Sequence, residues 1–237
     1  MKSRGDVTTR RTTTGVLIFG LLLATGGLAS AAKKAHVAPP QSHPHGQTYS
    51  EWAADWWVWG LEQPTPVNPL IDPTGAQCAS GQTGNVWFLA GSLGGGTVTR
   101  SCSIPTGTAL VFPMINNFYC AFLNDPPETR TEEFIRAQVA GTAGATVSAS
   151  IDGVPVQNPG SYFEESALFE VQLPADNIFG VGPDVVPELL LSPCADAGFY
   201  LFVNPLPPGP HTVTFQGSLG DFSLDVTYNL TIVPGRH

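Results

Sequence analysis

The C-terminal stretch Phe222-Ser-Leu-Asp-Val-Thr-Tyr-Asn-Leu-Thr-Ile-Val233 alternates apolar and polar residues along almost its whole length. Successive side chains of a β-strand point to opposite faces, so a period of two predicts a long strand with one buried face. The apolar positions are Phe222, Leu224, Val226, Tyr228, Leu230 and Ile232. Such a face must be buried against a second layer, so we expect a layered β fold.

Shorter β-type runs precede this strand, and residues typical of turns separate them. The expected strands are 85–90, 97–104, 109–114, 145–151, 154–156, 166–173, 198–203 and 211–216. Many short strands with frequent Gly and Pro and little helix predict a mainly β domain. We expect a β-sandwich of the jelly-roll or immunoglobulin-like type.

Turn chemistry and one capping pattern refine this arrangement. The Asp-Gly pair at 152–153 predicts a tight hairpin. The Pro-Pro-Gly-Pro stretch at 207–210 predicts a connection that is not part of a strand. The capping-box pattern Thr129-x-x-Glu132 predicts a short inserted helix through residue 140.

A longer, Trp-rich helix is expected at residues 49–62, with Thr48 or Ser50 as its N-cap and Pro64 ending it. Its aromatic side holds Tyr49, Trp52, Trp56 and Trp59, widened by Ala53 and Trp57, and its acidic side holds Glu51, Asp55 and Glu62. This spacing is typical of an amphipathic helix that packs its aromatic side against a core. Trp57 lies at the margin of the aromatic stripe and is the one expected to stay accessible.

The N-terminus has the pattern of an export signal. Basic residues in the first eleven positions precede an apolar, uncharged run at 16–24 and a small-x-small site at 29–31. We expect residues 1–32 to be a cleaved signal peptide, 33–46 a flexible tether and 47–237 one disulfide-stapled β domain. The Arg-Arg pair at 10–11 leaves both the Sec and the twin-arginine export routes open. The sequence thus predicts a secreted or extracytoplasmic protein with no transmembrane span after cleavage.

The charge balance is acidic, with 10 Lys and Arg against 19 Asp and Glu and a net charge of −9 at pH 7. Four of the basic residues lie in the expected signal peptide. No basic patch is available to neutralise phosphates, so we expect no nucleic-acid binding. No motif for a cofactor occurs, and none is expected.

Four cysteines, Cys78, Cys102, Cys120 and Cys194, follow the expected signal peptide. An even number in an oxidising compartment predicts two disulfides. Three pairings exist, and we favour Cys78 with Cys102 and Cys120 with Cys194. No C-x-x-C pair is present, which argues against a zinc or thioredoxin-like site.

Several blocks of this chain resemble sequences in a family of bacterial secreted proteins of unknown function. They are the Trp-rich segment at 49–59, Gly-Gln-Thr-Gly-Asn-Val-Trp-Phe-Leu-Ala-Gly at 81–91, Ile-Pro-Thr-Gly-Thr-Ala-Leu-Val-Phe-Pro at 104–113 and Pro-Gly-Pro-His-Thr-Val-Thr-Phe-Gln-Gly at 208–217. The resemblance implies a shared extracytoplasmic β domain. It carries no catalytic or binding role to any residue.

Three groups of side chains are candidates for chemistry. Glu51 and Asp55 lie one helical turn apart and are candidate catalytic carboxylates, since glycoside hydrolysis uses two acids held ~5 to 10 Å apart. The candidate ligand-binding residues are Trp52, Trp56, Trp57 and Trp59, which would stack on sugars if exposed and pack in the core if buried. The candidate metal ligands His36, His43 and His45 lie in the expected tether, where we expect no specific metal site.

These observations favour a secreted or cell-surface binding or structural module. Polysaccharide or another envelope polymer is the expected partner, because aromatic side chains are abundant and no catalytic constellation is complete. The alternative is an extracellular glycan hydrolase that uses carboxylates. The sequence leaves the oligomeric state open.

Overall fold

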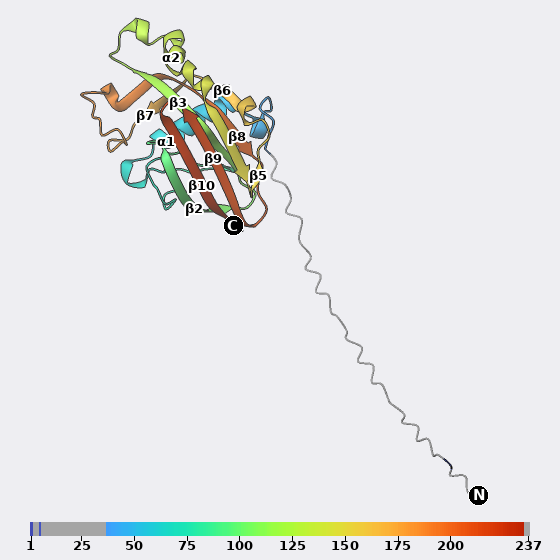
Figure 1. Ribbon diagram of the computed structural model, residues 1–237. Coiled ribbons are helices and arrows are strands. Elements are labelled where there is room, and N and C mark those ends of the chain that lie inside the picture. Colours follow the sequence, from blue (N-terminus) through green and yellow to red (C-terminus); the bar gives the residue numbers. More distant parts are fainter. Residues whose placement is uncertain (2–4, 6–36, 235–237) are drawn as a thin grey trace. The chain divides into compact units, whose positions relative to one another are not determined.

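The computed structural model describes residues 1, 5 and 37–234 (Figure 1). The chain divides at residue 32 into two units, and the fold below is that of the described part of the second unit. Nearly all of the expected signal peptide lies outside the described residues, as does His36. Cleavage and export therefore stay predictions.

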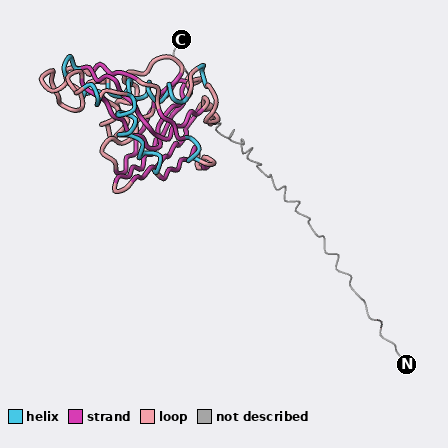
Figure 2. The backbone as a smooth tube through the Cα atoms, turned by 90° about the horizontal axis from the view of Figure 1, so that it is seen from above, coloured by secondary structure: helices cyan, strands magenta, loops and turns pink. Residues whose placement is uncertain are grey.

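Two five-stranded sheets form a β-sandwich with few helices, which confirms the predicted fold class. Sheet A has the order β1 (Val86–Phe88), β3 (Ala109–Phe122), β8 (Leu190–Val203) and β6 (Phe163–Glu165), and β7 (Phe169–Gln172) also pairs with β8. Sheet B has the order β2 (Gly96–Pro105), β10 (Phe222–Val233), β9 (Gly209–Leu219), β4 (Thr146–Ile151) and β5 (Val154–Pro155). Strand is more abundant than helix in the described backbone (Figure 2).

In sheet B, the alternating stretch at 222–233 forms β10, as predicted. It pairs antiparallel with β9 and parallel with β2, so both of its edges are hydrogen-bonded (Figure 1). The expectation that residues 207–210 lie outside any strand is wrong for Gly209 and Pro210, which begin β9. The neighbouring strand β4 pairs only as far as Val213, so Pro210 has a strand on one side alone, where proline is tolerated.

In sheet A, the central strands β3 and β8 are both longer than predicted. They form an antiparallel pair that continues from Leu110 opposite Val203 to Phe122 opposite Leu191. Strand β8 is buried almost throughout and contacts both helices, with Ile135 of α2 packing on Ala195 and Trp57 of α1 donating to Asp196. Polar residues in its first half, including Asp196, obscured this strand in the sequence.

Two α-helices pack on sheet A. Helix α1 (Tyr49–Leu61) begins at Thr48 with a complete capping box to Glu51, and it contacts β3, β6, β7 and β8. Helix α2 (Glu132–Val139) contacts β3 and β8. The predicted capping residue Thr129 is wrong: Thr131 caps α2 through Phe134 N–H, because Thr129 lies in a preceding 3₁₀ turn. The 3₁₀ turns are Pro44–Gly46, Thr65–Val67, Pro127–Thr129, Ala140–Gly144, Pro159–Tyr162 and Pro187–Leu189.

The core lies between the two sheets. Phe112 of β3 stacks on Phe215 of β9, with ring centroids 4.8 Å apart. Next to this pair the sheets approach closely at Gly217 of β9. A Cβ added there would lie 2.5 Å from Cβ of Ile115 and 2.7 Å from the Met114 carbonyl oxygen.

Gly217→Ala should therefore destabilise the domain by about 1 to 3 kcal/mol, the usual effect of overpacking a core. The methyl group meets a backbone carbonyl and a β-branched carbon, neither of which can move aside without shifting β3. Denaturant unfolding would measure the change. Gly141→Ala is the matched control, since a Cβ there meets nothing within 4 Å. Equal stability of the two variants would contradict this account of the packing.

The described part of the expected tether, residues 37–46, is not free. Val37 forms a β-bridge with Val203, and Ala38 N–H donates to the Phe202 carbonyl at 2.8 Å. The Tyr49 hydroxyl donates to the Ala38 carbonyl at 2.7 Å. The backbone of Val37 and Ala38 therefore extends sheet A beside β8, where the sequence led us to expect part of a flexible tether.

Two disulfides join Cys78 to Cys102 and Cys120 to Cys194, in the pairing favoured from the sequence. The second lies directly across the β3–β8 pair. The first ties a loop to β2, and buried Arg100 of β2 supports the same loop by donating to the Asp72 carbonyl at 2.7 Å. Among the described residues, no helix has the length and apolar character that a membrane span needs.

Candidate functional site

The four candidate Trp residues are all buried, with exposed fractions of 8% or less. Each indole N–H donates to a buried or partly buried acceptor: Trp52 to Pro44 O, Trp56 to Leu89 O, Trp57 to Asp196 Oδ2 and Trp59 to Ser80 O. They form part of the core, the alternative that the spacing on an amphipathic helix favours, and they do not present open ring faces to a ligand. Trp57, expected to stay accessible, is only 3% exposed because Asp196 and Phe118 hold it.

The edges of two of these rings nevertheless reach a surface groove. The groove runs along the acidic side of α1, against the loop at 81–86, and has a volume of about 510 Å³. Trp52, Trp59 and half-buried Phe88 line it together. Trp59 and Phe88 have ring centroids 5.4 Å apart, and Trp52 and Phe88 6.2 Å. The site therefore combines aromatic edges with the polar residues of one helix face.

Polar groups line the same groove. Asp55 and Glu62 stand two helical turns apart on α1, about 10 Å along the helix axis. Gln63 and Asn85 add amide groups from both sides. The Asp55 carboxylate accepts a hydrogen bond from Gln47 Nε2 at 2.8 Å, which fixes its position. This arrangement can accept hydrogen bonds from a hydroxyl-rich or amine-bearing ligand.

Glu51 and Asp55 do not face the same groove. Glu51 lies outside the groove, and its carboxylate accepts from the backbone N–H and hydroxyl of Thr48 at 2.7 and 2.9 Å. These hydrogen bonds hold the pKa of Glu51 below its ordinary value. A general acid needs a raised pKa, so Glu51 is suited to capping the helix and not to proton donation.

The two described candidate metal ligands do not assemble a site. His43 is exposed, and His45 lies against Phe202, with its Nδ1 at 3.3 Å from Asn85 Oδ1. Within residues 37–234, no three His, Cys, Asp or Glu side chains gather as a metal ion would require. His211 is engaged by Asp152 at 2.7 Å and by the Pro207 carbonyl at 2.8 Å.

A buried acid beneath α1 was missed from the sequence. Asp196 of β8 is fully buried and accepts from Trp57 Nε1 at 2.8 Å and from the Tyr200 hydroxyl at 2.9 Å. Asn116 Nδ2 in turn donates to the Tyr200 oxygen at 2.8 Å. Burial raises the pKa of Asp196 to about 8, so the side chain is a neutral acid below that pH. The signal in the sequence that could have identified this acid is a lone carboxyl residue within a largely apolar segment.

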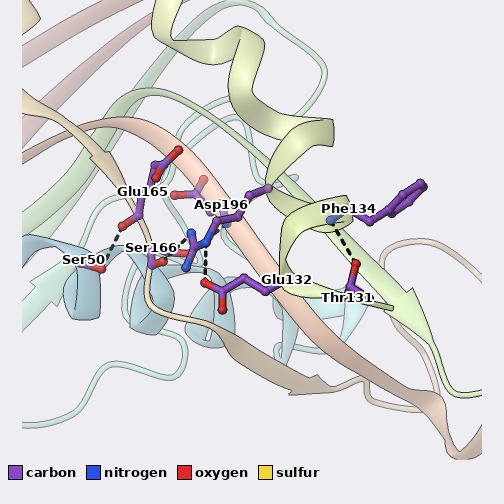
Figure 3. Close-up of polar contacts among 8 residues, drawn as sticks. Ser50, Thr131, Glu132, Phe134, Glu165, Ser166 and Asp196 are labelled. Carbon is purple, nitrogen blue, oxygen red and sulfur yellow. Dashed lines mark hydrogen bonds and ion pairs between the residues drawn. The ribbon is translucent and has the colours of Figure 1, made fainter. Parts of the chain in front are cut away.

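The backbone around Asp196 is equally well held (Figure 3). Its N–H donates to the Ser166 hydroxyl at 2.9 Å, and Ser166 N–H donates to the Asp196 carbonyl at the same distance. Arg136 of α2 reaches the Ser166 carbonyl at 3.1 Å and pairs with Glu132 at 2.7 Å. Ser50 of α1 donates to the Glu165 carbonyl at 2.8 Å. This cluster joins α1, α2 and sheet A and serves the fold.

A small pocket beside Asn116 and Trp57 has a volume of about 50 Å³. One water molecule occupies about 30 Å³ of the liquid, so the pocket is too small for a sugar or peptide side chain. The α1 groove is about ten times larger and lies within the usual size range of ligand sites. We therefore take the groove as the candidate functional site.

No family model matches the chain, and no curated protein is significantly similar to it. Two solved structures show low similarity. PbICP-C in complex with falcipain-2 is 10% identical with a TM-score of 0.27, covering 63% of this chain and 100% of that one. The cysteine protease inhibitor EhICP2 from Entamoeba histolytica is 14% identical with a TM-score of 0.21, covering 58% and 94%. Similarity at this level carries no functional argument, and the resemblance to bacterial secreted proteins stays a prediction.

Proposed function

We propose that the protein is a secreted binding module that holds a glycan chain in the α1 groove. The observation that carries this proposal is the convergence of three aromatic rings and two carboxylates in one open groove. Trp52, Trp59 and Phe88 give the groove apolar surface for the C–H groups of a sugar, and carboxylates accept hydrogen bonds from sugar hydroxyls. The two disulfides and the signal-like N-terminus support an oxidising, extracytoplasmic location.

The geometry favours binding over the alternative of carboxylate-dependent hydrolysis. The Glu51 carboxylate belongs to the capping box, where it accepts hydrogen bonds from Thr48. Asp55 is held by Gln47. The remaining acid of the groove, Glu62, is exposed and lies at the C-cap of α1, two helical turns from Asp55.

The α1 groove should lose glycan affinity when its carboxylates are removed. In the double variant Asp55→Ala/Glu62→Ala, we expect binding of cellohexaose or chitohexaose to weaken at least tenfold. A hydrogen bond to a charged group contributes about 1.5 to 3 kcal/mol, so one lost contact alone accounts for a tenfold change. Calorimetric titration gives the affinity, and tryptophan fluorescence reports contact at Trp52 and Trp59, which line the groove.

Glu133→Ala is the matched control, because it removes an exposed acid of α2 that lies outside the groove. It should bind as the unmodified protein does. Circular dichroism checks that the double variant is folded. Absence of binding by the unmodified protein to both hexasaccharides at millimolar concentration would refute the proposed function. Release of shorter sugars from either one would favour the hydrolase instead.

A further inference from the structure

The outward face of sheet B has an unusual composition. The strands β2, β10, β9 and β4 each bury alternate residues in the core and point the others outward. The outward positions are Thr97, Thr99, Ser101 and Ser103 of β2, Ser223, Asp225, Thr227, Asn229 and Thr231 of β10, Thr212, Thr214, Gln216 and Ser218 of β9, and Thr146, Ser148 and Ser150 of β4, with Pro105, Val233 and Pro210 at strand ends. Among these described positions, apart from the three at strand ends, every one is a hydroxyl or amide residue except Asp225.

The register aligns these side chains in rows across the sheet. One row runs from Thr97 through Asp225 and Gln216 to Ser148, and the next repeats the order with Thr99, Thr227, Thr214 and Ser150. Neighbours within the rows are hydrogen-bonded: Ser148 to Gln216 at 3.2 Å, Gln216 to Asp225 at 3.0 Å, and Ser150 with Thr214 at 2.7 Å. These three hydrogen bonds order part of each row.

The charge of this face differs from that of the rest of the protein. The whole chain carries a net charge of −9, yet Asp225 is the single acid in the rows, and Gln216 already donates to it. The edge strand β2 presents Thr97, Thr99, Ser101 and Ser103 on this face. Its open edge is covered in part by the loop tied to it, where Ser101 N–H donates to the Thr74 carbonyl at 2.9 Å. A face with this chemistry is complementary to a neutral partner.

Two shallow hollows lie on the same face, toward its opposite ends. One of about 300 Å³ is lined by Thr97, Ser148, Gln216 and Asp225. The other, of about 340 Å³, is lined by Ser101, Ser103, Thr212, Asn229 and Thr231. The surface is thus hollowed toward both ends of the strands, and neither hollow shares a residue with the α1 groove.

We propose that this outer face of sheet B is a second binding surface, for a neutral, extended polysaccharide that lies across its rows of hydroxyl and amide groups. Thr, Ser, Asn and Gln both donate and accept hydrogen bonds, as sugar hydroxyls do. An anionic or cationic polymer would find almost no opposite charge here. Single contacts of this kind are weak, but a long chain makes many at once, and linked contacts reinforce one another.

The test measures depletion of the full protein from solution by microcrystalline cellulose, chitin and curdlan, three neutral insoluble polysaccharides. We expect at least one of them to bind the unmodified protein. The face variant Thr227→Glu/Asn229→Glu places two charges in the middle of the rows and should lower the partition coefficient at least tenfold. Both positions point away from the core, and thermal unfolding confirms that the variant is folded.

Two controls separate this surface from others. Ala137→Glu/Gln138→Glu adds the same two charges at exposed residues of α2, outside sheet B, and should leave binding unchanged. Failure of the proposed function is measured separately, as unchanged hexasaccharide binding by the groove variant Asp55→Ala/Glu62→Ala, whereas this proposal fails if only the groove variant lowers depletion by the insoluble polymers. Absence of binding to all three polymers overturns the proposal, as does unchanged binding by the face variant. A dimer that only the face variant dissociates would overturn it too, by assigning the surface to a second copy of this chain.

Discussion

Replacing Asp196 by asparagine should remove most of the pH dependence of stability between about pH 4 and pH 8. Burial raises the pKa of Asp196 from 3.8 to about 8, so within this window the folded state keeps a proton that the unfolded state releases. The free energy of unfolding then falls as pH rises. The contribution is complete below about pH 4 and is lost as pH rises through about 8, with a slope of about 1.4 kcal/mol per unit.

Asparagine is the appropriate substitute because it resembles the neutral acid. Its carbonyl oxygen can accept from Trp57 Nε1 or from the Tyr200 hydroxyl, the two groups that donate to the acid. Alanine would instead leave both partners without an acceptor in the core, at about 1 to 3 kcal/mol for each. Urea unfolding at several pH values should therefore show a steep slope for the unmodified protein and a shallow one for Asp196→Asn.

A matched control is Glu164→Gln. Burial also raises the pKa of Glu164, but this side chain is only partly buried, so its variant should change the slope less. An Asp196→Asn protein with the same pH slope as the unmodified protein would show that the carboxyl is not held neutral by burial. Loss of native fluorescence in Asp196→Asn at every pH would show that asparagine fails to replace the acid.

Local patterns in the sequence were sufficient for much of the fold. The period-two stretch at 222–233 became β10, the Trp-rich segment became α1, and the Asp-Gly pair at 152–153 joins β4 to β5. Each of these signals is short in range and rests on neighbouring residues. The β-sandwich follows from them because apolar faces of strands must be buried against one another.

Features that depend on long-range pairing were not predictable. The first half of β8 contains Ser, Pro and Asp, and becomes strand because β3 and β7 pair with it. Residues 37–38 look like a linker but add to the edge of sheet A. In both places tertiary contacts decide the structure, and no local pattern encodes them.

The sequence predicted which types of residue form the candidate site, but not how these residues are arranged in space. The sequence placed aromatic and acidic residues on α1, but the Trp faces are buried and only the edges of Trp52 and Trp59 line the groove. The opposite wall comes from residues 81–86, which no periodic pattern connects to the helix. Likewise, alternation identified the outward residues of single strands, but the rows on sheet B require the register between four strands.

Removing the disulfide between Cys120 and Cys194 should destabilise the domain by about 4 kcal/mol. The bridge closes a long loop, with 74 residues of sequence separation, and a closed loop of this length restricts the unfolded chain strongly. In the folded state the two residues face each other across β3 and β8, so the strands hold them together without the bond. The variant Cys120→Ala/Cys194→Ala should therefore fold at low temperature and unfold at a lower denaturant concentration.

The effect should be greatest near helix α2. Its Ile135 packs against Ala121 and Ala195, the residues that follow the two cysteines, in a small cluster apart from the main core. Without the bond, this end of the β3–β8 pair opens more readily, and amide hydrogen exchange in α2 should rise before exchange in β10 does. The denaturant m-value should also increase, because the unfolded chain is less compact.

The second disulfide provides the matched control. Cys78 and Cys102 are separated by 24 residues, so their removal should cost about 3.5 kcal/mol by the same loop argument. Its local effect should fall on β2 and on the loop that Arg100 supports, with α2 unchanged. Increased exchange in α2 for both double variants would mean that the whole domain loosens together. If loss of the Cys120–Cys194 bond left the stability unchanged, the bond would not stabilise the domain by restricting the unfolded chain.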